Sequence, residues 1–159
     1  MIGLRTRCLV LLAVMVVALA ATTAGRERQD AAARRTVWNG VYTAAQADRG
    51  AAVYTQDCAN CHGAGLEGAD MSPALAGAAF MASWNDLSLG DLFERIRISM
   101  PADRPGTMTR QQMADVIAHL LRANRFPAGA TELPLETPAL RTLKFVTVQP
   151  SEGVDAGPR

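Results

Sequence analysis

The stretch Cys58-Ala59-Asn60-Cys61-His62 decides how this sequence is read. Its two thiols stand about one helical turn apart, and an imidazole directly follows the second thiol. The sequence has only one further cysteine, Cys8, so this single close pair does not make a disulfide framework. A different use of the two thiols is therefore indicated.

The C-x-x-C-H spacing predicts covalent attachment of haem. Two thiols at this distance form thioether bonds to the two haem vinyl groups, and the adjacent His62 becomes an axial iron ligand. C-x-x-C also occurs as a redox dithiol, but that use needs a strand–helix setting, and here a predicted helix precedes the motif. It also forms half of a zinc site, but there is no second cysteine pair and His119 is the only other histidine. We therefore predict one covalent haem c, with its iron, at Cys58, Cys61 and His62.

The N-terminus has the pattern of an export signal. Arg5 and Arg7 precede an unbroken apolar run over residues 8–21, and Ala18-Leu19-Ala20 is a cleavage site of small residues. This order is typical of a secretory signal peptide, and the run is shorter than the roughly 20 apolar residues of a membrane span. We assign residues 1–24 to a signal peptide and the Arg-rich residues 25–40 to a linker. The protein is then periplasmic or otherwise exported, and it contacts a membrane only if the segment is an uncleaved anchor.

Composition agrees with a cofactor-filled core in one domain. The chain has 159 residues, 49% of them hydrophobic but only 5% aromatic. A large flat cofactor would supply the missing apolar surface. Residues 44–159 carry ten Lys and Arg against thirteen Asp and Glu, a balance of −3, so we expect no nucleic-acid partner.

Three helices are predicted from their starts. At each one a hydroxyl side chain is followed three residues later by an amide or acid that reaches back to the cap. The first helix should run to about Asp57, the second should end before Pro101, and the third, which has strong apolar periodicity, before Pro127. The three caps are Thr43, Ser88 and Thr109.

The remaining segments show little periodicity. Residues 63–87 predict a long loop, which in a compact domain needs something to fill its inside. Residues 140–148 suggest one short strand, which we interpret as a surface wrap rather than a docking strand. Residues 151–159 are expected to be disordered.

A second axial ligand must come from downstream of His62. Met100 lies in an otherwise polar loop, and Pro101 restricts it to an extended conformation that can aim its side chain inward. Met108 is an alternative that precedes the third helix and is better placed to pack there. His119 is a rival within the third helix, where its apolar neighbours favour packing on or beside the core.

With Cys58–His62, Pro73-Ala74-Leu75 and Met100-Pro101 in view, residues 41–127 resemble class I c-type cytochromes. The likeness is strongest to the small bacterial mono-haem type found with quinoprotein dehydrogenases and oxidases. It implies an all-α fold with three principal helices around one covalent haem. Residues 128–159 lie outside the resemblance, and we expect them to form an irregular, partly disordered C-terminal extension.

The resemblance also implies roles for single residues. Gly50 matches the glycine at which the first and last helices cross, and His119 stands where the family usually has an aromatic residue. Pro73 matches the proline whose carbonyl accepts from the proximal histidine, and Met100 matches the distal ligand. Leu75 and Trp84 are expected to line the haem.

The function implied is single-electron transfer, as a carrier or as the cytochrome subunit of a periplasmic dehydrogenase or oxidase chain. Its partners would be redox proteins, and the chain would not itself be an enzyme. The alternative is a haem enzyme with an open iron site, such as a peroxidase, which would need acid–base groups near the iron.

Overall fold

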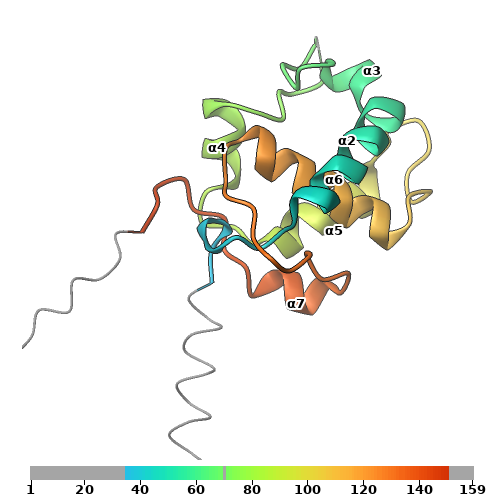
Figure 1. Ribbon diagram of the computed structural model, residues 1–159. Coiled ribbons are helices and arrows are strands. Elements are labelled where there is room, and N and C mark those ends of the chain that lie inside the picture. The colour runs from blue at the N-terminus through green and yellow to red at the C-terminus, as the bar shows by residue number, and fades with distance from the viewer. Residues whose placement is uncertain (1–34, 70, 151–159) are drawn as a thin grey trace, which may run out of the picture. The chain divides into compact units, whose positions relative to one another are not determined.

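The computed structural model describes residues 35–69 and 71–150. These residues form a 3-10 turn and six α-helices (Figure 1), and their only β pairing is three isolated bridges. The described part of the chain is therefore all-α, as predicted. The predicted signal peptide and the tail from Ser151 lie outside the described residues. The elements are η1 (Val37–Asn39), α2 (Ala44–Asp57), α3 (Ala59–His62), α4 (Ala78–Trp84), α5 (Leu89–Ser99), α6 (Arg110–Ala123) and α7 (Thr137–Arg141).

The three predicted helix starts are confirmed. The hydroxyls of Thr43, Ser88 and Thr109 each accept a hydrogen bond from the backbone N–H three residues on. For α5 and α6 the reciprocal bond also forms, because Asp91 and Gln112 each accept from the backbone N–H of their cap at 2.9 Å. These local bonds satisfy backbone donors that would otherwise be free at a helix start.

Gln46 of α2 departs from this pattern. It is fully buried, and its Oε1 accepts from the backbone N–H of Leu133, 87 residues further along the chain, at 2.8 Å. The capping pattern therefore located α2 correctly but gave the wrong role to Gln46, since a longer-range partner takes its side-chain oxygen.

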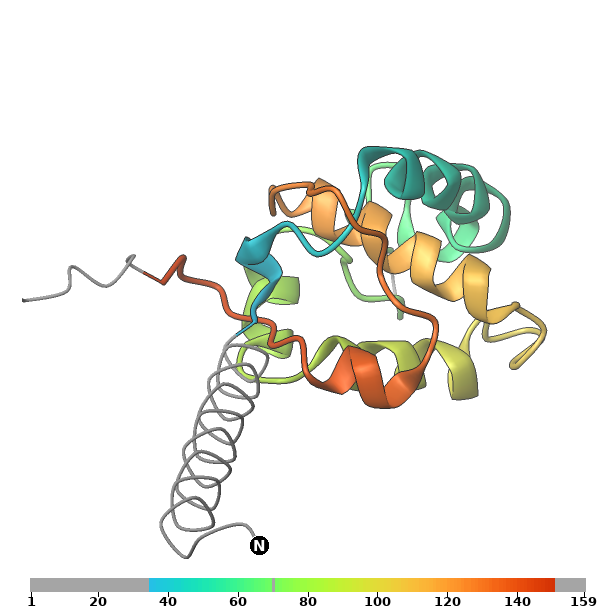
Figure 2. The same cartoon turned by 60° about the horizontal axis from the view of Figure 1, so that its bottom comes forward.

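Helices α2 and α6 pack closely against each other (Figures 1 and 2), with Gly50 at the contact. A Cβ at Gly50 would lie 1.8 Å from the carbonyl oxygen of Asp115 and 3.0 Å from the Cβ of His119. Only glycine permits so close an approach of the two backbones. The role of Gly50 at the helix crossing is confirmed. His119 packs there against Tyr54, with ring centroids 5.2 Å apart.

The chain after Pro127 is more than an irregular extension. We call residues 128–147 the C-terminal strap; it folds back over the helices, and residues 137–141 form α7. The strand suggested for residues 140–148 is not formed. Instead, Lys144 makes single bridges to Thr36 and to Ser88. Four apolar side chains of the strap are at most 3% exposed and belong to the core: Leu133, Leu140, Leu143 and Phe145.

Two further segments are more ordered than the sequence suggested. The compact unit begins at Arg35, and Val37 of η1 is fully buried, with its backbone N–H donating to the carbonyl of Lys144 at 3.0 Å. The end of the expected linker is thus part of the packed structure. The loop expected over residues 63–87 contains α4, which was missed because it is short and mostly Ala, Met and aromatic.

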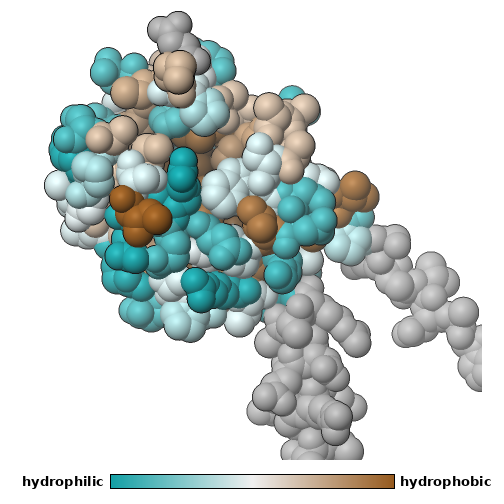
Figure 3. All heavy atoms as spheres, turned by 180° about the vertical axis from the view of Figure 1, so that it is seen from behind, coloured by the Kyte–Doolittle hydropathy of each residue, from teal (hydrophilic) through white to brown (hydrophobic). Residues whose placement is uncertain are grey.

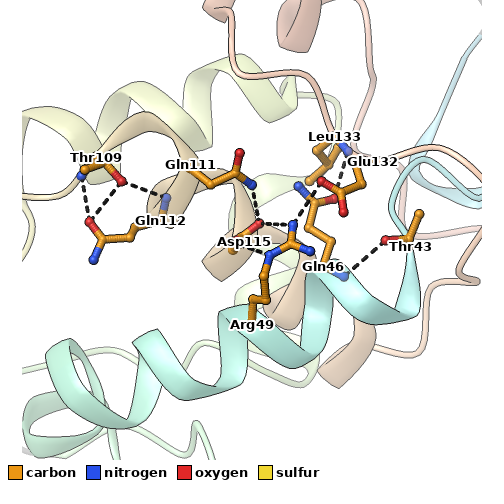
Figure 4. Close-up of polar contacts among 9 residues, drawn as sticks. All are labelled: Thr43, Gln46, Arg49, Thr109, Gln111, Gln112, Asp115, Glu132 and Leu133. Atoms are coloured by element: carbon orange, nitrogen blue, oxygen red, sulfur yellow. Dashed lines mark hydrogen bonds and ion pairs between the residues drawn. The ribbon is translucent and has the colours of Figure 1, made fainter.

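Polar side chains fasten the strap to α2 and α6 (Figure 4). Arg49 of α2 donates to Asp115 of α6 at 3.0 and 3.1 Å and to Glu132 of the strap at 2.9 Å. Gln111 donates to the same Asp115 carboxylate at 2.7 Å. Asp115 is only 3% exposed, so it needs these donors to offset the loss of hydration. One buried carboxylate therefore joins α2 and α6, and Arg49 extends the link to the strap.

The surface offers few large apolar side chains. On the face in Figure 3, strongly hydrophobic residues stand apart from one another among hydrophilic ones. None of the helices in the described residues is both long enough and apolar enough to span a membrane. The most exposed large apolar residues in this part of the chain are Met71, Leu87, Ile98 and Val148.

Candidate functional site

The Cys58–His62 segment forms a tight turn at the end of α2. Cys58 caps α2, its backbone N–H donating to the carbonyl of Tyr54 at 2.9 Å, and residues 59–62 then form α3. Cys58 is half-buried, Cys61 is exposed, and both are free thiols. His62 is buried, with 7% of its surface exposed. The helical turn thus presents two free thiols and one imidazole within five residues.

The imidazole of His62 is held in one tautomer. Its Nδ1 lies 2.8 Å from the carbonyl oxygen of Pro73. Because a carbonyl only accepts hydrogen bonds, Nδ1 carries the proton, and Nε2 keeps a free lone pair for a metal. This contact is the one that the family resemblance implies for Pro73. The backbone also holds the segment, since the N–H of Gly68 donates to the carbonyl of His62 at 2.8 Å.

These residues line a cavity of about 770 Å³. Its wall combines the turn after α2, residues 71–75, α4, α5, the loop after α5, and α6. The lining is mostly apolar, as in cofactor sites that exclude water. All seven residues predicted to bind the cofactor lie on this wall: Cys58, Cys61, His62, Pro73, Leu75, Trp84 and Met100.

The three candidates for the second axial ligand differ in position. Met100 is half-buried on the cavity wall, and its backbone is extended, with φ −126° and ψ 148°, as expected for a residue before proline. Met108 also lines the cavity but is buried, with 8% exposed. His119 does not line it; its Nδ1 is buried without a hydrogen-bond partner among the described residues, and burial lowers its pKa.

The surroundings of Cys58 argue against dithiol exchange at this motif. Burial, and then the neighbouring Asp57 carboxylate, raise the pKa of Cys58 to about 11. Redox-active C-x-x-C motifs instead have a thiol whose pKa is lowered, because the thiolate is the attacking form.

Within the described residues, no cluster of three or more His, Cys, Asp and Glu side chains is arranged to hold a metal ion.

Two contacts at the site were not anticipated from the sequence. The hydroxyl of Tyr54 donates to the carbonyl of Gly63 at 2.7 Å, which fixes the end of the C-x-x-C-H turn. Arg104, in the loop after Met100, pairs with Asp57 at the end of α2. This ion pair joins the thiol side of the cavity to the methionine side. The Tyr54 contact could have been predicted, because Tyr54 stands only four positions before the C-x-x-C motif. The ion pair could not, because its two residues are 47 positions apart and no sequence pattern relates them.

Comparison with known proteins agrees with this geometry. Residues 45–120 match the family model described as cytochrome c oxidase, cbb3-type, subunit III. The chain contains a class I c-type cytochrome domain. Its cofactor is therefore haem c, which is bound covalently, and its chemistry is haem-based electron transfer.

The other comparisons add little to this assignment. A chain in the crystal structure of the sulfane dehydrogenase SoxCD from Paracoccus pantotrophus is similar at 20% identity, with a TM-score of 0.45. The match covers 68% of this chain and 61% of that one, so the cytochrome spans less than two thirds of that relative's length. The comparison with curated proteins gives no match.

The cytochrome domain has the residues that haem c requires. Two free thiols and the free lone pair of the His62 imidazole stand at one wall of the cavity, and the lining around them is largely apolar. Met100 and Met108, both from the chain after α5, line the same cavity. The site therefore fits haem c both in its donor groups and in its largely apolar lining.

Proposed function

We propose that this protein is an exported mono-haem cytochrome that passes single electrons, with His62 and Met100 as the axial ligands of its iron. It acts as a carrier or as the cytochrome subunit of a periplasmic dehydrogenase or oxidase chain. The observation that carries the proposal is the cavity of about 770 Å³, which brings the Cys58–His62 turn and Met100 to one site although they are far apart in sequence.

Each residue has a distinct task in this proposal. Cys58 and Cys61 hold the cofactor through thioether bonds, so it is not lost during electron transfer. The hydrogen bond from Nδ1 to Pro73 orients the His62 ring and strengthens Nε2 as a donor. When bound, haem c supplies a ferric/ferrous couple, and a thioether ligand from Met100 raises its potential.

The apolar wall supports electron transfer rather than reaction with a substrate. Leu75, Trp84 and Ile96 line the cavity and keep water from the site. With His62 and Met100 both bound to the iron, no position would remain open for a substrate. An open-iron haem enzyme is the competing function, and it requires that Met100 does not bind.

Export is part of the same proposal. Residues 1–24 have the signal-peptide pattern, and we infer that the domain works in the periplasm or an equivalent compartment, with redox proteins as partners. Only an uncleaved segment would hold it at a membrane.

The visible spectrum of the purified protein tests the proposal. Low-spin, six-coordinate haem in both redox states is expected, together with a protein mass that still includes haem after acid–acetone treatment. High-spin, five-coordinate haem would instead support an open-iron enzyme. Absence of haem, or haem that extracts freely, would contradict the proposal altogether.

A further inference from the structure

Helix α5 carries the cavity on one face and the C-terminal strap on the other. Leu92, Ile96 and Met100, spaced four residues apart, line the cavity. Positions two residues apart on an α-helix point about 200° apart, so Gly90 and Glu94 point away from the cavity. Figure 2 shows α7 of the strap along α5. The strap therefore stands directly behind the wall that presents Met100.

The contact at Gly90 leaves no free space. A Cβ there would lie 2.4 Å from Cγ of Arg141 and 2.9 Å from the Arg141 backbone nitrogen. Both distances are shorter than real Cβ contacts, and one of the atoms is backbone. The strap thus limits how far α5 can move away from the cavity.

Hydrogen bonds fix the same helix in register. The backbone N–H of Leu89, at the start of α5, donates to the carbonyl of Leu143 at 2.9 Å. The hydroxyl of Thr137 donates to the Glu94 carboxylate at 2.7 Å. The start and the middle of α5 are therefore both bonded to the strap.

The strap in turn takes its own position from α2 and α6. Leu133 is bonded to Gln46 of α2, and Nε of Arg110 on α6 donates to the carbonyl of Leu135 at 2.9 Å. The Arg110 guanidinium also lies 5.1 Å from the centroid of the Phe93 ring of α5. Helix α2 leads directly into the Cys58–His62 turn, which we call the histidine wall of the cavity; α5 ends at Met100, and we call this side the methionine wall. The strap contacts both α2 and α5, so it connects the two walls.

We propose that the C-terminal strap is a positioning element, which sets the spacing of these two walls and so holds the Met100 thioether against the iron. The proposal rests on the proposed function, in which Met100 is the axial ligand. In this cytochrome the segment that follows the cytochrome domain controls the strength of the methionine–iron bond without touching the cavity.

Imidazole binding to the oxidised full-length holoprotein measures this strength. Imidazole competes with the Met100 sulfur for the iron, so its apparent affinity rises when methionine binding weakens. Gly90→Ala forces α5 and α7 apart, and we expect imidazole to bind about tenfold more tightly, the order of effect that an overpacked contact produces. The near-infrared sulfur-to-iron band should weaken in parallel.

A milder pair of variants separates this role from folding. Thr137→Val removes the hydroxyl that reaches Glu94 and keeps the side-chain shape, and imidazole should bind about threefold more tightly. Thr142→Val is the matched control, because the exposed Thr142 donates only to Ala139 within the strap, and it should match the wild type.

The outcomes distinguish the two proposals. If Gly90→Ala and Thr137→Val lower thermal stability but keep the wild-type imidazole affinity and near-infrared band, the strap only stabilises the fold and the inference is wrong. If instead Met100→Ala itself leaves imidazole affinity unchanged, methionine ligation is wrong, and the ligand assignment in the proposed function fails.

Discussion

The Cys58–His62 turn lines the cavity and the C-terminal strap packs behind α5, and the sequence encodes these two regions in opposite ways. One helical turn brings two thiols and an imidazole together, so these five residues are enough to predict the donor groups of the site. The strap buries four apolar residues at irregular spacing: Leu133, Leu140, Leu143 and Phe145. The donor groups of the site are thus specified by residues next to one another in the sequence, whereas the position of the strap depends on contacts between distant segments.

The largest expected effect comes from removing the buried aromatic side chain of the strap. Phe145 is 1% exposed and packs edge-on against Phe126, with ring centroids 5.1 Å apart. Phe145→Ala should lower the free energy of unfolding by about 3–5 kcal/mol, because a buried aromatic side chain leaves a cavity. Chemical denaturation followed by circular dichroism measures this. Val148→Ala, at a position 78% exposed, should change it by less than about 0.5 kcal/mol; equal effects would mean that the strap is not part of the core.

The next test disturbs the packing that both regions share. A methyl group at Gly50 would meet the Asp115 carbonyl oxygen, so Gly50→Ala must separate α2 from α6. We expect a loss of about 1–3 kcal/mol in the same denaturation experiment. Gly65→Ala is the control, since the nearest atom there is the end of the flexible Glu67 side chain, at 3.0 Å. If the control is as costly as Gly50→Ala, the close crossing of α2 and α6 is not what requires glycine.

Much of the fold could be predicted because its signals are local. The three hydroxyl caps located α2, α5 and α6, and the end of α2 at Asp57 follows from its continuous pattern. The C-x-x-C-H motif and Met100-Pro101 each carry their chemistry within a few residues. The cavity wall brings these residues together with Pro73, Leu75 and Trp84.

The rest could not be predicted because its partners are far along the chain. Gln46 has the spacing of a capping residue, but Leu133 takes its oxygen. Phe145 and Leu140 lie in the stretch for which the sequence suggested a strand on the surface, so the local pattern did not indicate that both belong to the core. Arg104 reaches Asp57 across the cavity, and no sequence spacing specifies that pair.

The smallest expected effect concerns pH and the link between α5 and the strap. Hydrogen bonds from Arg97 and then from Thr137 lower the pKa of Glu94 to about 2, from an ordinary 4.5. The folded state therefore binds the proton less readily than the unfolded state, so this contribution is complete above about pH 5 and is lost as the pH falls toward 2. Glu94 is partly exposed, so the contribution is below about 1 kcal/mol.

Thr137→Val should reduce that pH dependence. The variant loses one of the two bonds that favour the ionised carboxylate, so its melting temperature should fall less than that of the wild type between pH 6 and pH 3. Thr142→Val, which leaves Glu94 untouched, should follow the wild-type profile. Three identical profiles would show that the Thr137–Glu94 bond contributes nothing measurable.

The near-infrared spectrum of oxidised Met100→Ala, set beside that of Met108→Leu, tests the central claim most directly. Both residues line the cavity, but Met100 is half-buried with an extended backbone, whereas Met108 is buried, with 8% of its surface exposed. Met100→Ala should keep the covalently attached haem, lose the sulfur-to-iron band and have a lower reduction potential, because a thioether ligand favours the ferrous state. Met108→Leu should keep both the band and the potential. A band that survives Met100→Ala and disappears in Met108→Leu would contradict the account.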